Sequence, residues 1–537
     1  MPFSFLRPFP TAAACLLALL GLGEAGCARR DYFQPDARVG AGSTAPLPPG
    51  ADSVQAAAGR HYSQHWPTYY WFWGRHYRDV WAAPVTAPVL DLATAVPGGL
   101  RPSKMGGGYQ SISMTLEGPQ KREFALRALE KEPSKTLPKV LRNTFLLNAV
   151  RDATSAANPY AALTVPPLAA AAGVPHARPR LVYVRPDETG LGEGSERFRG
   201  KLALLEEKYE VLASRTPDLA GATDFLGGES MLKKVYEHPS HTIDQPAFLR
   251  ARLLDLLIGD WDRHEGQWEW AAYRVRGGRV RYKPIPKDRD QVYFRFDDGL
   301  VPWLAARRFI APQFHTFKAS YGYVPGLVKQ SRFIDERGLY ALTRADFRRM
   351  ATDLQRRLPD TLLERAMHRL PPAVFALEGP RLTSYLKARR TALPAAADAF
   401  YLTLAHAPTL GGTAQAERFV VQRFPDSTTV RVFSAALARH NAGDSLRFQR
   451  TYYACETHEL SLDALGGDDV FEVSTVSTAR PMPLRLYGGA GHDRLLLSGS
   501  ARRLHLFDED SDMTAANGRR PSLPRKSYRA YERLNDD

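Results

Sequence analysis

The sequence predicts an α+β fold in which a strand-rich segment, a helical segment and a second strand-rich segment follow one another. The first observation is the alternation of apolar and polar residues in short runs between residues 96 and 215. The second is helical periodicity with turn punctuation through most of residues 216–400. The third is the return of short alternating runs over residues 401–510. With 537 residues, the chain is long enough for two or three cores.

The first 27 residues are typical of an export signal. One arginine is followed by an apolar run from Ala12 to Leu22 and then by small residues before Cys27. The end of this stretch, "GEAGC", resembles a bacterial lipobox, although Glu24 stands where an apolar residue is usual. We therefore expect lipidation at Cys27 and a location in the cell envelope, as an outer-membrane lipoprotein. An ordinary secretory signal with an incidental cysteine is the alternative.

Cysteine content and charge narrow the function classes. Only Cys15, Cys27 and Cys455 are present, so we expect no disulfide framework and no thiolate metal site. The formal net charge is +15, but the basic residues are mostly scattered singly and form no stripe with interleaved aromatics. Nucleic-acid binding is therefore not expected. The partner expected from the N-terminus is a membrane surface, reached through the lipid anchor.

Residues 28–95 are predicted to be a linker followed by an aromatic arm. Residues 28–60 are rich in Ala, Gly, Pro and Ser, which is typical of a tether. The next stretch, "RHYSQHWPTYYWFWGRHYRDVW", is dense in aromatic residues and should pack on the main body. Carbohydrate binding by these rings is the alternative.

Four strands and a helix are expected between residues 96 and 215. A glycine-rich turn at Gly106, Gly107 and Gly108 opens the strand "SISMTLEG". The stretch "REFALRALEK" alternates, which places Arg127 on the face opposite Phe124. A helix at about 138–155 and the strands "RPRLVYVRP" and "GKLALLEEKYE" follow.

The segment 259–290 carries most of the chemistry. An apolar run, "FLRARLLDLLI", predicts a buried helix and leads into "GDWDRHEGQWEW". Two strands, "QWEWAAYRV" and "RVRYKPIP", are joined at Gly277-Gly278, which predicts a two-residue hairpin turn with Gln267 opposite Asp288. We therefore expect four polar side chains to converge at the open end of the hairpin: Asp262, Gln267, Asp288 and Asp290.

Such a set of side chains suits phosphoryl transfer. One carboxylate can position the attacking hydroxyl, while an amide and a second Asp hold a divalent cation that neutralises the phosphate oxygens. Oxygen ligands suit magnesium or manganese. Alternation turns Lys287 and Arg289 away from Asp288 and Asp290, so we expect a divalent metal to neutralise these carboxylates.

"GDWDRHEGQW" resembles the catalytic loop of atypical kinases, in which D-R-H-x-x-N supplies a catalytic Asp and a metal-binding Asn. Phosphoinositide lipid kinases, HipA-type kinases and secretory-pathway protein kinases use versions of this loop. "YKPIPKDRDQVYF" resembles the metal-binding segment of CotH-type kinases. The resemblance implies a two-lobed kinase-like domain, with an N-lobe at 96–215 and a C-lobe at 216–400. A β-rich domain at 401–510 and a polar tail at 511–537 would follow.

The resemblance also implies roles for individual residues, and with them magnesium or manganese and ATP or another nucleotide. Asp262 would be the catalytic Asp, and His264 is a second catalytic candidate unless it is a structural histidine. The implied metal ligands are Gln267, Asp288 and Asp290. Arg127 stands where kinases have a lysine, with Asp152 as its candidate helix partner. The implied nucleotide-binding residues are Gly106, Gly107, Gly108, Arg127, Glu206 and Glu207.

Two further patterns bear on partners. The order of motifs along the chain also resembles a group of Bacteroidetes surface proteins, whose larger members carry an outer-membrane barrel. "GGDDVFEV" and "GGAGHDRLLL" form a weak repeat, and the second copy fits the calcium-binding G-G-x-G-x-D-x-U-x coil over residues 488–496. Calcium coils need stacked tandem copies, so we expect turns between β-helix-like rungs, with calcium an unlikely ligand.

Two function classes follow from these observations. The first is metal-dependent phosphoryl or nucleotidyl transfer, which the retained carboxylates favour. The alternative is a non-catalytic scaffold or binding lipoprotein of the envelope, whose β-rich domain would bind an outer-membrane barrel protein or an envelope glycan. Arg127 and Gln267, in place of the usual lysine and asparagine, favour this alternative.

Overall fold

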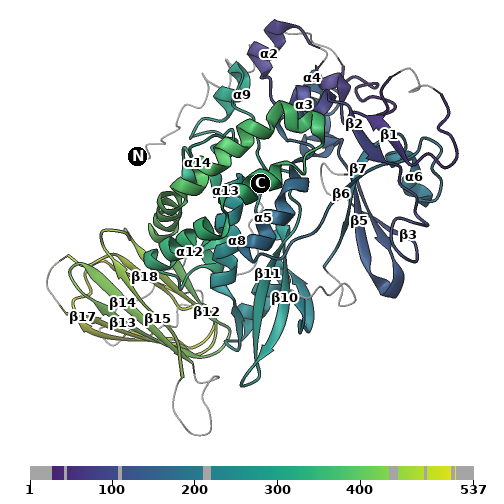
Figure 1. The fold of residues 1–537 in the computed structure, drawn as a ribbon. Coiled ribbons are helices and arrows are strands. Elements are labelled where there is room, and N and C mark those ends of the chain that lie inside the picture. Colours follow the sequence, from purple (N-terminus) through teal and green to yellow (C-terminus); the bar gives the residue numbers. More distant parts are fainter. Residues whose placement is uncertain are drawn as a thin grey trace.

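The computed structural model describes residues 27–508, apart from 41–44, 64, 107–111, 210–218, 435–444 and 477–479, together with residues 514 and 515. About 35% of the chain is helix and 26% is strand, which confirms the α+β class. Figure 1 shows a helical body with the N-terminal sheets on one side and the C-terminal β-rich domain at the opposite end.

The segment before residue 96 is part of the body. The aromatic stretch packs on the core as predicted, with Tyr62 and Trp81 buried, but the described residues of 28–60 also join the body instead of forming a tether. Strands β1 (Ser53–Ala56) and β2 (Val85–Pro88) pair in antiparallel fashion, and the short helices α2 (Pro67–Trp73) and α3 (Arg78–Ala82) lie between them in the chain. Ala37 and Ala56 are fully buried. This corrects the expectation of a tether over 28–60, because small alanine side chains let this segment approach the core closely.

The predicted N-terminal strands form one antiparallel sheet in the order β3-β4-β5-β7-β6. Its inner face carries a separate apolar core that includes Phe124, Leu126 and Ala128, so Arg127 lies on the opposite face as alternation predicts. The strands are β3 (Arg101–Gly106), β4 (Ser113–Glu117), β5 (Glu123–Ala128), β6 (Arg180–Tyr183) and β7 (Leu202–Glu207). Two helices, α4 (Phe145–Ala153) and α5 (Val165–Ala172), lie between β5 and β6 in the chain.

Helix α8 (Gln245–Ile258) is the buried helix that the apolar run predicts. The Asp244 side chain accepts a hydrogen bond from the Ala247 N–H at its start, and Gly259 ends it with a φ of 69°. A four-stranded sheet, in the order β8-β10-β11-β9, follows and includes the predicted hairpin. Its strands are β8 (Asp224–Gly227), β9 (His241–Ile243), β10 (Trp268–Val275) and β11 (Arg279–Pro286).

The register of this hairpin differs by one residue from the prediction. Val275 pairs with Arg279, so three residues form the turn, and both Gly277 and Gly278 have positive φ. The prediction of a two-residue turn was wrong because Arg276 belongs to the turn rather than to β10. Gln267 therefore lies opposite residue 287, whose N–H donates to the Gln267 carbonyl oxygen at 3.0 Å.

Helices fill the middle of the chain, and the longest one links two regions. Helix α14 (Pro372–Ala405) packs on α8, where the Arg389 guanidinium donates to the Leu256 and Leu257 carbonyl oxygens at 2.6 and 2.8 Å. Near its other end, the Tyr401 hydroxyl donates to Glu456 at 2.8 Å. Among the described residues, no helix is both long and apolar enough to cross a membrane. The other helices are α7 (Gly228–Glu237), α9 (Leu300–Ala305), α10 (Val324–Leu327), α11 (Arg332–Gly338), α12 (Arg344–Arg357) and α13 (Asp360–Met367).

The C-terminal region stacks its strands in parallel rungs. Leu460 pairs with Leu484, 24 residues on, and Leu484 pairs with Leu504, 20 residues on. The other sheet repeats both spacings, so the rungs do not have one constant length. One sheet has the order β12-β16-β18-β20 and the other β15-β14-β13-β17-β19-β21. The strands are β12 (Thr409–Thr413), β13 (Glu417–Arg423), β14 (Ser427–Ser434), β15 (Ser445–Tyr453), β16 (Leu460–Leu465), β17 (Val470–Thr475), β18 (Leu484–Tyr487), β19 (Arg494–Gly499), β20 (Leu504–Phe507) and β21 (Thr514–Ala515).

Candidate functional site

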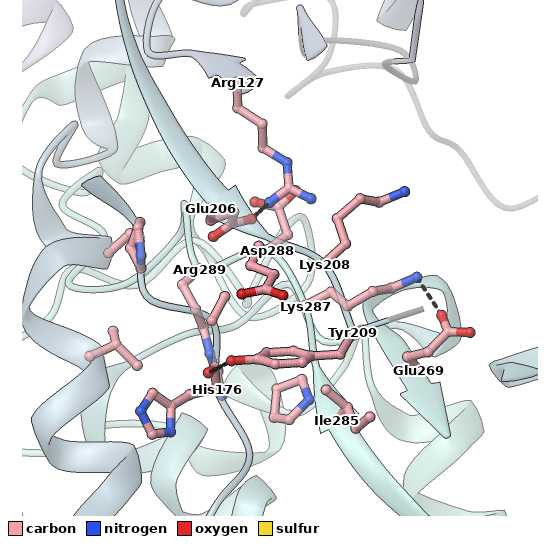
Figure 2. A pocket seen from close by; sticks show the side chains of 16 residues that line it. Arg127, His176, Glu206, Lys208, Tyr209, Glu269, Ile285, Lys287, Asp288 and Arg289 are labelled. Atoms are coloured by element: carbon pink, nitrogen blue, oxygen red, sulfur yellow. Dashed lines mark hydrogen bonds and ion pairs between the residues drawn. The ribbon is translucent and has the colours of Figure 1, made fainter. Parts of the chain in front are cut away.

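A pocket lies where the outer face of the N-terminal sheet meets the end of β11 (Figure 2). Arg127 of β5 and Glu206 of β7 contribute from the sheet, and Asp288 contributes from the residues after β11. Its wall also includes apolar groups such as Val165 and Ile285. A pocket with an apolar wall and a few convergent charged groups is the usual form of a small-molecule site.

The two expected nucleotide-binding glutamates form ion pairs with arginines of the sheet. Glu206 is paired with Arg127, and Glu207 with Arg122 at 2.5 Å. Burial raises the pKa of Glu206, and the nearby Asp288 and Asp290 raise it further, while Arg127 lowers it. Arg127 and Glu206 therefore form an ion pair close to the carboxylates of Asp288 and Asp290.

Asp152 is not the partner of Arg127. Its carboxylate accepts two hydrogen bonds from Arg78 of α3, both at 2.6 Å, and it is buried. This corrects the expectation of a helix partner on α4. The physical reason is that a buried bidentate pair satisfies both carboxylate oxygens of Asp152 on the side of the N-terminal segment.

Arg263 fixes the relative positions of the two ends of the hairpin. Its guanidinium donates to the Lys287 carbonyl oxygen at 2.6 Å, to the Asp288 carbonyl oxygen at 3.1 Å and to the Gln267 carbonyl oxygen at 3.0 Å. The His264 Nδ1 accepts a hydrogen bond from the Gly266 N–H at 3.1 Å, which closes the turn before β10. Gln267 and His264 thus have backbone-positioning roles here, and the Gln267 side chain forms no hydrogen bond with any described residue.

The basic residues beside the carboxylates in sequence are engaged elsewhere. Lys287 forms an ion pair with Glu269 at 3.0 Å. Arg289 is paired with Asp255 and also with Asp260, at 2.8 Å. These two cations are therefore engaged away from Asp288 and Asp290. Their own ion pairs cause this rather than strand alternation, because β11 ends at Pro286.

The cation that does lie among the carboxylates is Lys131, which the sequence analysis missed. Its ammonium is paired with Asp290. Burial alone would lower the pKa of Lys131, but Asp290, Asp288 and Asp262 outweigh burial and raise it. The available signal was its place in "ALRALEK", three residues after the end of β5 and four after Arg127.

Asp262 and Asp288 are the free carboxylates of the site. Neither side chain forms a hydrogen bond or ion pair with any described residue. Burial, followed by the charge of Asp290, raises the pKa of Asp262 to about 6. Burial would also raise the pKa of Asp288, but Arg127 and Lys131 are the largest of the opposing charges that lower it below its usual range. The Asp262 carboxylate can therefore accept a proton near neutral pH, whereas the Asp288 carboxylate stays ionised.

The donor set fits a hard divalent cation only with help from a ligand. No group of three or more His, Cys, Asp or Glu side chains lies close enough to bind a metal ion in the part of the chain that the structure describes. Magnesium commonly uses one or two carboxylates and completes its shell with water and substrate phosphates. Asp288 and Asp290 are the two that would serve, and a metal would compete with Lys131 for Asp290.

The glycine-rich turn begins on the same rung of the sheet as Arg127. Gly106 pairs with Ser113 across β3 and β4, and Ser113 pairs with Arg127 across β4 and β5. Gly107 and Gly108 lie outside the described residues. Gly106 therefore ends β3 on the same rung as Arg127, with β4 between them.

Comparison with known proteins adds no relative to this chain. No protein-family model, curated protein or solved structure matches it. Function must therefore be inferred from the residues of the pocket and their surroundings.

Proposed function

We propose that this protein is a kinase-like phosphotransferase, which transfers a phosphoryl or nucleotidyl group to an acceptor in the presence of a divalent metal. The observation that carries the proposal is the free Asp262 carboxylate, placed beside a second free carboxylate, Asp288, and the cations Arg127 and Lys131. Phosphoryl transfer relies on this combination of a positioned acceptor and neutralised phosphate charge.

Each charged group has a role in this proposal. Arg127 and Lys131 bind the phosphates of the donor, and Asp288 and Asp290 hold magnesium or manganese, which neutralises the phosphate oxygens. Asp262 orients the acceptor hydroxyl and takes up its proton, which a pKa of about 6 permits near neutral pH. Glu206, which the resemblance implies to be a nucleotide-binding residue, here pairs with Arg127 and releases it when a phosphate binds.

The chain organisation supports a two-lobed arrangement for this chemistry. An antiparallel sheet within residues 101–207 carries Gly106 at the end of β3, on the same rung as the phosphate-binding Arg127, and the helical part with the carboxylates follows it. In kinases, a glycine-rich turn covers the nucleotide phosphates, and the sequence predicts such a turn at Gly106, Gly107 and Gly108. We further propose that the enzyme is exported and anchored by a lipid on Cys27, which is exposed.

Calorimetry with ATP and either magnesium or manganese tests the proposal on residues 27–537. We expect wild-type protein to bind the metal–nucleotide complex and to turn it over. Asp288→Asn should abolish binding, whereas Asp262→Asn should retain binding and lose turnover by at least about 100-fold. Asp52→Asn, an exposed carboxylate on the N-terminal segment, is the matched control and should behave as wild type.

A non-catalytic binding protein of the envelope is the second candidate. The Arg127–Glu206 and Lys131–Asp290 ion pairs favour it, because they neutralise much of the site without a ligand. The strand β15, at the edge of its sheet, also exposes Leu446 and Tyr453, a surface that a barrel protein or glycan could contact. Absence of nucleotide binding by wild-type protein, with any metal, would favour this candidate over the enzyme.

A further inference from the structure

Large apolar side chains are exposed together at one end of the molecule. Six of them are between 46% and 82% exposed, and they come from α2, from α9 with the residues that follow it, and from the segment before α4. We refer to them as the aromatic face: Trp66, Trp71, Val140, Trp303, Phe309 and Ile310. A soluble surface seldom exposes several large aromatic residues together without a partner.

Helices α2 and α9 pack against each other, so their exposed residues lie on neighbouring elements. The two helices are in contact, and a Cβ atom on Gly299 would overlap the backbone of Gly74. Close by, His76 is paired with Asp298 at 2.6 Å. This tight junction leaves Trp71 and Trp303 on elements that cannot move apart independently.

The end of the predicted export signal lies at the same end of the molecule. Cys27 forms a β-bridge with Thr144, and the Arg29 N–H donates to Asn148 of α4 at 3.0 Å. At the other end of α4, Asp152 lies 3.7 Å from His65, directly before α2. In Figure 1, α9, α2 and α4 follow one another along this end, away from the β-rich domain. Cys27 itself therefore lies beside α4, at the same end as the aromatic face.

Basic residues accompany the aromatic face. Within 27–31, 66–75, 139–143 and 303–310, Asp31 is the one exposed acidic residue. The exposed basic residues of these segments are Arg29, Arg30, Arg75, Lys139 and Arg308. This local excess of positive charge is complementary to anionic headgroups, and aromatic rings with nearby lysine and arginine are typical of groups that enter a membrane interface.

We propose that the aromatic face binds the surface of a phospholipid bilayer that contains anionic lipids. The rings of Trp66, Trp71 and Phe309 enter the headgroup region, and Arg30 and Lys139 contact lipid phosphates. This binding needs neither acylation of Cys27 nor the proposed phosphotransferase activity. It orients the body so that the β-rich domain points away from the bilayer.

Vesicle sedimentation of residues 27–537 carrying Cys27→Ser tests the proposal without a lipid anchor. This parent protein, with no other substitution, should bind vesicles of phosphatidylcholine with phosphatidylglycerol. The double variant Trp71→Ser/Phe309→Ser should bind at least tenfold more weakly. Leu446→Ser/Tyr453→Ser removes two apolar side chains of comparable exposure from the β-rich domain, and it should bind as well as the parent.

A charge variant separates lipid binding from simple stickiness. Arg30→Glu/Lys139→Glu should lose the preference for anionic vesicles and bind them no better than pure phosphatidylcholine. Circular dichroism should show unchanged folding for all variants, since every substituted residue is exposed. Failure of the parent to bind anionic vesicles would overturn the proposal, and so would an equal loss in the β-domain control. Binding to phosphatidylcholine alone with equal strength would overturn the role of the basic residues.

Discussion

Asp260 and Asp262 are separated by one residue, and burial raises the pKa of both carboxyls, to about 7 and about 6, yet only Asp260 has ion-pair partners. Asp260 is buried, is paired with Arg289 at 2.8 Å and lies 3.7 Å from Arg263. Asp262 has no ion pair or hydrogen bond to any described residue and lies beside two other carboxylates. The first belongs to a closed network that supports the loop, and the second is left free to meet a ligand.

The closed network explains why the open cluster can exist. Asp255 contacts Arg252 at 2.7 Å, Arg263 at 3.3 Å and also Arg289. Asp255, Arg252 and Arg263 are buried, and the Arg289 side chain is 12% exposed. Arg263 in turn donates to the backbone on both sides of the hairpin end. Carboxylates that repel one another stay close only when such a frame holds their backbone in place. The comparison teaches that the loop motif divides into supporting and reacting residues.

The largest effect is expected from breaking the closed network. Asp255→Asn removes the carboxylate that faces three arginines. Arg252 keeps Asp335 and Arg289 keeps Asp260, so one positive charge of the network is left without its counter-charge. We expect the free energy of unfolding in urea to fall by about 3–5 kcal/mol. Glu336→Gln, which removes the half-buried partner of the exposed Arg332 on one helix, is the control and should cost less than about 1 kcal/mol. Equal losses in both variants would contradict the division between the two clusters.

The pH dependence of Asp262→Asn is expected to be the next largest effect. Because the folded pKa of Asp262 is raised to about 6 from 3.8, its contribution to stability is complete below about pH 4 and is lost as pH rises through about 6. The asparagine side chain of the variant does not titrate, so the free energy of unfolding of the variant does not fall in this way. Its stability relative to wild type should therefore increase between pH 4 and pH 7, by about 1–2 kcal/mol after allowance for solvent screening. A difference that does not change with pH in urea unfolding would show that Asp262 is not in this environment.

Removal of Lys131 sharpens the comparison, because it opens the cluster further. Lys131→Met takes the ammonium from Asp290 and leaves its charge available to a divalent ion. We expect manganese, titrated without nucleotide by calorimetry, to bind about tenfold more tightly. Lys135→Met changes an exposed lysine four residues on and should leave the affinity unchanged. Weaker manganese binding by Lys131→Met would mean that metal and lysine do not compete.

The smallest effect is expected at Gln267. Its carbonyl oxygen receives the Lys287 N–H and the Arg263 guanidinium, and any residue at this position supplies that oxygen. Gln267→Ala should therefore change manganese affinity by less than about twofold and stability by less than about 0.5 kcal/mol. A larger loss of metal affinity would restore the side chain as a metal ligand, as the sequence resemblance implies.

Local patterns predicted the elements better than they predicted their partners. Alternation placed Arg127 on the pocket side of β5, and the apolar run before residue 259 predicted α8. The hairpin itself was predicted, but its register was not, because the sequence does not show whether Arg276 ends a strand or starts a turn. One residue of error moves Gln267 from Asp288 to Lys287.

Contacts between distant segments were the part that the sequence could not supply. Lys131 meets Asp290 across 159 residues, and Asp152 meets Arg78 across 74. No local periodicity records such a pair, since each pair joins elements that are distant in sequence. The sequence also could not predict that Asp255, inside an apolar helix, is buried. Its buried charge is compensated by three arginines, two of which lie outside the helix.

Helix α14 also fixes the rotation of the β-rich domain relative to α8. Arg389 caps the last carbonyls of α8, and Tyr401, further along the same helix, contacts Glu456 and Arg450 of the β-rich domain. An α-helix advances 1.5 Å and turns about 100° per residue. One residue inserted between these two contacts would rotate the β-rich domain by that angle relative to α8, whereas a whole turn would nearly restore its direction. Length in this interval is therefore measured in turns of helix and not in residues.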